Sequence, residues 1–98
     1  MLDKMKALFE MQKKMQEVKR ELDNTNFEIE SSDGSVKITM NGAQEVKEVI
    51  LRDNLSEEEK ARLGNSLKDA FNRGIKRSQE IAAQKMKDVT GLNLPGLT

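Results

Sequence analysis

The chain has 98 residues, enough for one domain, and only 36% of them are hydrophobic, with three aromatic residues in total. It contains no histidine and no cysteine, which excludes disulfides, thiolate metal sites and the Ser-His-Asp and Cys-His catalytic arrangements. The 17 basic and 17 acidic residues cancel, and so small an apolar content predicts that the chain self-associates to complete its core.

The charges are separated along the chain although they sum to zero. Residues 1–22 hold six basic and four acidic side chains, residues 23–59 three basic and ten acidic, and residues 61–98 seven basic and three acidic. A neutral chain with basic ends can still bind a polyanion through those ends. No stretch resembles a membrane span or the apolar core of a signal peptide, so we expect a cytoplasmic protein without membrane partners.

Residues 1–23 predict a helix with an apolar seam. The seam recurs at alternating steps of three and four residues, a spacing typical of a face shared by two helices. We therefore predict that it contributes to a dimer interface. Its members are Leu8, Met11, Met15, Val18 and Leu22.

The same helix carries a line of basic residues, Lys6, Lys13 and Arg20, spaced seven residues apart. Such a line could follow a phosphate backbone and is a candidate DNA-binding surface. The alternative is an ordinary solvated face, in which Glu10 pairs with Lys13 or Lys14 and Glu17 pairs with Arg20. The spacing alone favours this alternative.

Residues 27–52 predict three antiparallel strands, because apolar and polar residues alternate there. Asp33-Gly34 and Asn41-Gly42 tolerate positive φ and predict tight hairpins on either side of the second strand. The third run alternates imperfectly, which predicts a bulge or a strand covered on both faces. We place Ile38 and Met40, from the second strand, in the dimer interface.

Residues 56–90 predict a long helix that opens with a capping box between Ser56 and Glu59. Gly74 projects onto the apolar stripe of this helix and predicts a close crossing by another helix. A break near Gly64 is the alternative to one continuous helix. Gly91 is the predicted cap, and residues 91–98 form an apolar tail that we expect to dock on a partner subunit.

The long helix also carries the second candidate DNA-binding surface. Six basic and two acidic residues lie between positions 68 and 87. A helical projection places Arg73, Lys76 and Lys87 opposite the apolar stripe, with Arg77 on its flank. For these residues the sequence favours contact with DNA phosphates and an ordinary solvated face equally. We find no aromatic residue among the basic residues on the outer face of either helix, which favours a DNA duplex over unpaired bases as the partner.

Several segments occur in a characteristic order: Met11–Gln16 (MQKKMQ), Gly34–Gly42 (GSVKITMNG), Asp53-Asn54-Leu55, Ala70-Phe71-Asn72, Lys85-Met86 and the closing GLNLPG. In this order and spacing the whole chain resembles the YbaB/EbfC family of bacterial nucleoid-associated proteins.

The resemblance implies an α+β fold in a single domain spanning residues 1–98. An N-terminal helix, a three-stranded antiparallel sheet and a long C-terminal helix would form an intertwined homodimer. It implies binding of double-stranded DNA in the nucleoid, with roles in nucleoid organisation and gene regulation. It supplies no catalytic residue, cofactor, metal or small-molecule substrate. Because this chain is neutral, with a pI near 6.3, we expect its DNA binding to be sensitive to salt.

Two other classes of function stay open at this point. A Met-rich helical face can bind varied partners, so an adaptor or holdase is the main alternative. A hydrolase that uses carboxylates alone would require a concave pocket lined by at least two of them.

Overall fold

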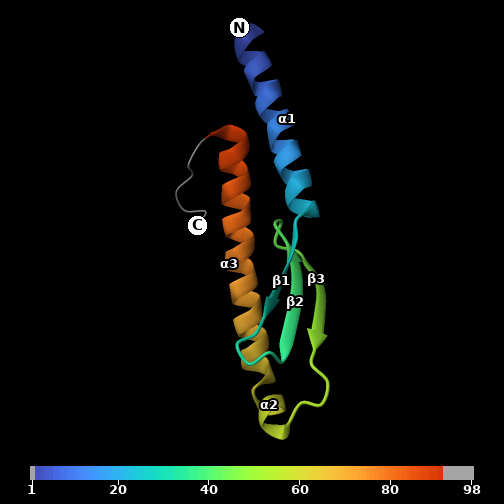
Figure 1. Cartoon of the computed structure of the whole chain (residues 1–98). Helices are drawn as coiled ribbons and strands as arrows, with labels where there is room; N and C mark the ends of the chain where they lie inside the picture. The colour runs from blue at the N-terminus through green and yellow to red at the C-terminus, as the bar shows by residue number, and fades with distance from the viewer. Residues whose placement is uncertain (1, 92–98) are drawn as a thin grey trace.

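The order of helices and strands confirms the predicted α+β fold. The computed structural model describes residues 2–91. Its elements are α1 (Leu2–Asn24), β1 (Asn26–Glu30), β2 (Val36–Asn41), β3 (Val46–Leu51), α2 (Glu57–Ala61) and α3 (Leu63–Thr90). Figure 1 shows the sheet beside the first half of α3, with α1 continuing past the sheet alongside the second half of α3. The molecule is accordingly elongated, with principal extents of 67 × 23 × 16 Å.

The sheet has the order β1-β2-β3, and all neighbours are antiparallel. The central strand β2 supplies the core: Val36, Ile38 and Met40 are at most 1% exposed and pack with Ala70 of α3. Helix α3 contacts β1 and β2, and no comparable contact joins it to β3 within the described residues. One half of the sheet is therefore covered by α3, while its β3 side is left open.

The β2–β3 turn joins α1, the sheet and α3 at one point. The amide of Gly42 donates to the carbonyls of Leu22 and Thr25, each at 3.0 Å. The Ser78 hydroxyl on α3 donates to the Asn41 carbonyl at 3.0 Å and accepts from the Gln44 amide at 3.0 Å. This turn fixes where α1 leaves the sheet, because backbone and side-chain hydrogen bonds reach it from both helices.

The two hairpins differ in how well the sequence predicted them. Gly34 has a φ of 73°, as the Asp33-Gly34 turn requires. In the second hairpin the positive φ lies at Gln44, not at Gly42, so the predicted Asn41-Gly42 turn geometry is wrong. Gly42 serves a close approach, since a Cβ there would lie 2.8 Å from Cδ2 of Leu22.

The sequence also predicted, in part, three features of β3, α2 and α3. β3 contains the expected bulge, opposite Thr39 and Met40, but it is exposed along its whole length and not covered on both faces. The capping box at Ser56 and Glu59 is present. The helix breaks at Arg62, two residues before Gly64, which confirms the alternative of a broken helix.

Candidate nucleic-acid interface

The basic line of α1 lies on the side of that helix away from the protein core. Val18 is 4% exposed, and Arg20 follows it by about 200° around the helix, so the two side chains point to opposite sides. Lys6, Lys13 and Arg20 are all exposed. Within the described residues no carboxylate lies within ion-pair distance of any of the three.

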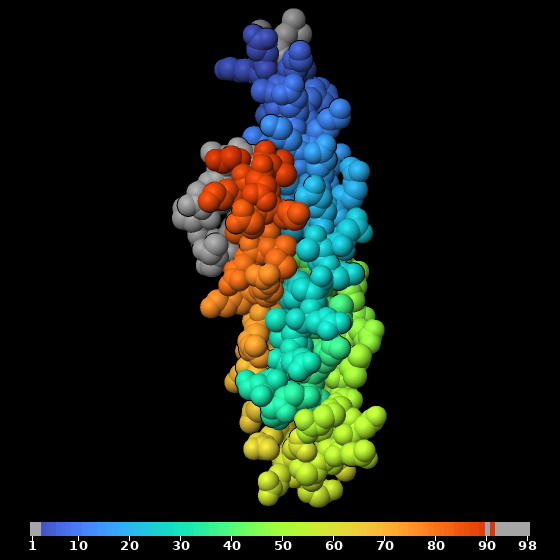
Figure 2. Space-filling model, viewed as in Figure 1, coloured from blue at the N-terminus to red at the C-terminus, as the bar shows by residue number. Residues whose placement is uncertain are grey.

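This arrangement corrects one expectation from the sequence. Glu10 and Glu17 were expected to pair with Lys13 and Arg20, and neither pair is present among the described residues. The cations of α1 therefore make no ion pair with any other residue in the described part of the chain. Figure 2 shows the first half of α1 (blue) standing clear of α3 (orange to red), so an extended duplex could approach this part of the helix.

Two of the candidate cations on α3 are instead engaged within the chain. The guanidinium of Arg73 donates to the Glu30 carbonyl at 2.5 Å and lies 3.8 Å from Asp69. Arg73 therefore turns toward the edge of β1, which corrects its predicted place opposite the apolar stripe. The guanidinium of Arg77 lies 3.6 Å from Glu80. Both ion pairs reduce the positive charge that this part of α3 offers to DNA.

Lys76 and Lys87 remain exposed on α3. The structure brings Arg73, Lys76 and Arg77 to the rim of one shallow hollow of about 320 Å³ beside Ile29 of β1. Lys87 lies about three turns further along the helix and does not line this hollow. The α3 candidates thus form one cluster of three side chains and one separate cation.

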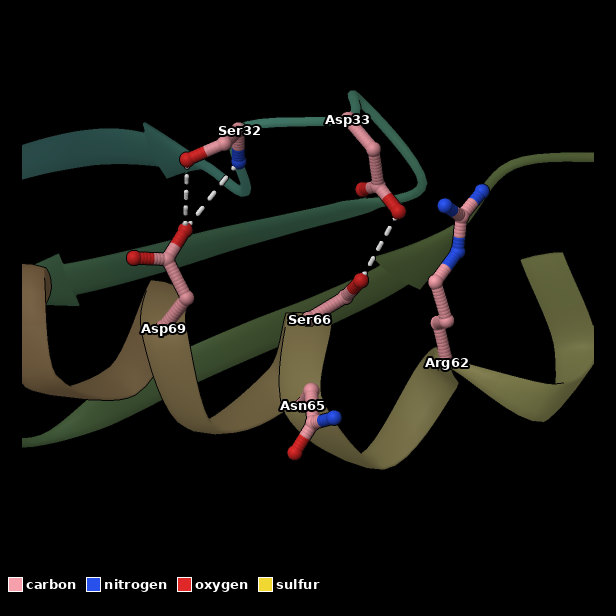
Figure 3. A pocket seen from close by; sticks show the side chains of 6 residues that line it. All are labelled: Ser32, Asp33, Arg62, Asn65, Ser66 and Asp69. Carbon is pink, nitrogen blue, oxygen red and sulfur yellow. Dashed lines mark hydrogen bonds between the residues drawn. The ribbon is translucent and has the colours of Figure 1, made fainter.

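A second hollow, of about 250 Å³, lies between the β1–β2 hairpin and the start of α3. Figure 3 shows its lining side chains: the Ser32 amide and hydroxyl donate to Asp69, and the Ser66 hydroxyl donates to Asp33 at 2.8 Å. The Ser35 hydroxyl and amide also donate to Asp33, at 2.7 and 3.0 Å. Both carboxylates therefore hold the hairpin against α3.

This hollow is the pocket that a carboxylate hydrolase would need, since two acids line it. The hydrogen bonds from Ser35, and then those from Ser31 and Ser66, hold the pKa of Asp33 well below its usual range. A carboxylate so stabilised is a weak base and is not a proton donor near neutral pH. No group of three or more potential metal ligands occurs among the described residues. The geometry favours a structural role for this pair over a catalytic one.

The residues predicted for the dimer interface fall into three groups. Ile38 and Met40 are buried inside the single chain, so neither has surface left for a partner; the structure corrects this placement. Val18 is likewise buried, and Met15 and Leu22 are half-buried. The N-terminal members of the seam are exposed: Leu8 at 69% and Met11 at 47%.

The structure adds an apolar surface that the sequence analysis did not single out. On β3, Val49 and Leu51 pair with Ile38 and Val36, so they lie on the face of the sheet that α3 covers elsewhere. They are nevertheless 43% and 45% exposed, and Ile75 on the neighbouring side of α3 is 38% exposed. The signal was present in the sequence as an apolar third strand, but its spacing did not reveal which side α3 would leave open.

Comparisons with known proteins agree with this architecture. A model described as the YbaB/EbfC DNA-binding family matches residues 1–93. The structure is similar to that of an uncharacterized protein, HP0035, from Helicobacter pylori, with a TM-score of 0.75 and 25% sequence identity. That match covers 87% of this chain and 90% of the other. None of the described helices is long and apolar enough to cross a membrane.

Proposed function

We propose that this chain, which belongs to the YbaB/EbfC DNA-binding family, binds double-stranded DNA as a homodimer through the outer faces of its helices. The observation that carries the proposal is the line of Lys6, Lys13 and Arg20 on α1, exposed and free of ion pairs within the described residues. In this proposal α1 supplies the main phosphate contacts. Lys76 and Lys87 of α3, with the partly engaged Arg73 and Arg77, add to them.

The dimer in this proposal forms through the open side of the sheet. Arg73 reaches the β1 edge and Gly74 faces Met40, so Ile75, a further 100° around α3, lies on the side toward β3. Together with the exposed Val49 and Leu51 it would form one apolar surface between β3 and α3. The same surface of a second copy would cover it in a two-fold arrangement, since a closed dimer uses one patch twice. Two copies would present the α1 line twice, so a chain of zero net charge would offer two basic surfaces to a duplex.

Phosphate contacts of this kind predict how binding responds to conditions. Affinity arises mainly from the release of counterions and therefore falls steeply with salt. No described side chain suggests base reading in a groove, so any preference among sequences would come from DNA shape and deformability. Binding along many sites in the cytoplasm would then organise the nucleoid and alter transcription of the genes it covers.

The test is duplex binding across a salt series with the variant Lys13→Gln/Arg20→Gln. A dimer loses two cations from each chain, so the slope of log K against log salt should become shallower by up to about 3.6. The matched control is Lys37→Gln/Lys60→Gln, which removes the same charge from side chains already paired with Glu28 and Glu57. Equal loss of affinity in the two variants would refute the assignment to α1.

The adaptor or holdase function has one observation in its favour. Met5, Phe9 and Met11 are 47–68% exposed, so part of α1 could contact apolar segments of other proteins. The test is whether this chain suppresses the aggregation of an unfolded client protein. If the Phe9→Ser and Met11→Ser variants suppress aggregation as well as the parent protein does, this face of α1 is not used.

A further inference from the structure

The apolar seam of α1 is covered along only part of its length. Where α1 runs beside α3, Val18 is 4% exposed and Met15 is half-buried. Beyond the end of α3 the same seam continues with Met11 and Leu8, which are 47% and 69% exposed. The covering element therefore stops before the apolar seam does (Figure 1).

The uncovered part of α1 is wider than the seam itself. Met5 and Phe9 are 58% and 68% exposed, and with Leu8 and Gln12 they line a shallow hollow of about 200 Å³. Four exposed large apolar side chains within seven residues of one helix make a contiguous patch, of the kind that marks an interaction surface. We call Met5, Leu8, Phe9 and Met11 the tip patch.

The chain leaves the described structure close to this patch. Helices α1 and α3 run antiparallel, and Glu21 pairs with Lys85 at 3.5 Å, which places Gly91 about level with Met15. Gly91 has a φ of 72° and ends α3, its amide donating to the Lys87 carbonyl at 2.7 Å. From the level of Met15 to that of Met5 is about 15 Å along α1.

Residues 92–98 have the length and the chemistry to cover that distance. Seven extended residues span about 23 Å. Leu92 and Leu94 would share one side of an extended segment, Leu97 adds a third apolar side chain, and Pro95 prevents continuation of the helix. Three leucines follow directly after the point where the helical cover of the seam ends.

The expected docking of the tail on a partner subunit concerns residues outside the described part of the chain. We propose instead that residues 92–98 dock on the tip patch of the same chain and continue the cover that α3 provides further down α1. The occupant is the chain's own tail because the tail starts beside the seam and its reach exceeds the distance needed. Leu8 and Met11 lie on the side of α1 away from Lys13, whereas Phe9 borders the basic line, since Lys6 and Lys13 lie three and four residues from it. The docked tail keeps the tip patches of different molecules apart. This inference does not depend on DNA binding.

The first test is disulfide trapping in the full-length protein. The chain has no cysteine, so any bond formed by Leu8→Cys/Leu94→Cys joins those two positions. The control is Glu10→Cys/Leu94→Cys, whose first cysteine lies about 160° from Leu8 around α1 and about 100° or more from the other members of the tip patch. Mild oxidation followed by mapping of linked peptides should show an intrachain bond that forms at least tenfold faster in the Leu8 pair. Equal rates, or bonds only between chains, would overturn the proposal.

The second test measures exposure of the tip patch without added cysteines. The variant Leu92→Ser/Leu94→Ser/Leu97→Ser should at least double the fluorescence of a bound apolar dye, whereas Asn93→Ser should leave it unchanged. Adding Leu8→Ser and Phe9→Ser to the triple variant should reverse the increase, which locates the dye. A triple variant with unchanged dye fluorescence would overturn the proposal, provided that its helical content matches that of the parent protein.

Discussion

Replacement of Gly74 by alanine sets two effects of known size against each other. Alanine in a helix interior is favoured over glycine by about 1 kcal/mol. A Cβ on Gly74, however, would sit well inside van der Waals contact of Sδ of Met40, which is 1% exposed and surrounded by the core. Overpacking of this kind costs about 1–3 kcal/mol. We expect the cost to win, with a net loss of up to about 2 kcal/mol in the free energy of unfolding.

The measurement is urea unfolding followed by circular dichroism at one fixed protein concentration. Gly64→Ala in the same helix is the control, since nothing lies within 4 Å of a Cβ there, and it should stabilise by up to about 1 kcal/mol. Met40→Ala should be less costly in the Gly74→Ala background than alone, because the alanine fills part of the space. Equal stabilisation by Gly74→Ala and Gly64→Ala would refute the reasoning.

Three further outcomes follow from the structure. Val49→Asp should convert the dimer to monomer in analytical ultracentrifugation, while Ile50→Asp, on the other face of the same strand, should leave it dimeric; the reverse pattern would contradict the proposed interface. Asn41→Ala should lower the free energy of unfolding, measured by chemical denaturation, by about 2–4 kcal/mol, because the buried Asn41 amide donates to the Asp23 carbonyl and to Glu45. A loss under about 1 kcal/mol would contradict the role of the β2–β3 turn in holding the sheet to α1. The stabilisation by Asp33 is present above its unfolded pKa of about 4 and is lost as pH falls toward the lower folded value. The difference in the free energy of unfolding between the parent protein and Asp33→Asn should therefore narrow between about pH 4 and pH 2. A constant difference would contradict stabilisation by the ionised, hydrogen-bonded Asp33 carboxylate.

Local chemistry in the sequence predicted the features that depend on a few adjacent residues. The turn at Gly34, the capping box at Ser56 and the left-handed cap at Gly91 all follow from side-chain and backbone properties within one turn. The alternation that defines β2 was equally clear. These features do not depend on what packs against them.

What the sequence left undetermined was the identity of each packing partner. The spacing of Val18 and Leu22 showed that one face of α1 is buried, but a partner subunit and α3 of the same chain satisfy that pattern equally. Gly74 predicted a close approach correctly, yet the approaching element is β2 and not another helix. The hydrogen bond of Arg73 likewise depends on the Glu30 carbonyl, which lies 43 residues away in the sequence.

The contact between Arg73 and Glu30 also bears on how such a sheet can grow. An open strand edge is a template on which further chains can add without limit. On β1 the Glu30 carbonyl accepts a hydrogen bond from the Arg73 guanidinium, and the Glu30 side chain places a negative charge near that end of the strand. The opposite edge strand, β3, is interrupted by the bulge opposite Thr39 and Met40 and carries the exposed charges of Lys47 and Glu48. Both edges of the sheet therefore oppose the addition of further strands, and the same arginine that weakens the charge of α3 also closes part of one edge.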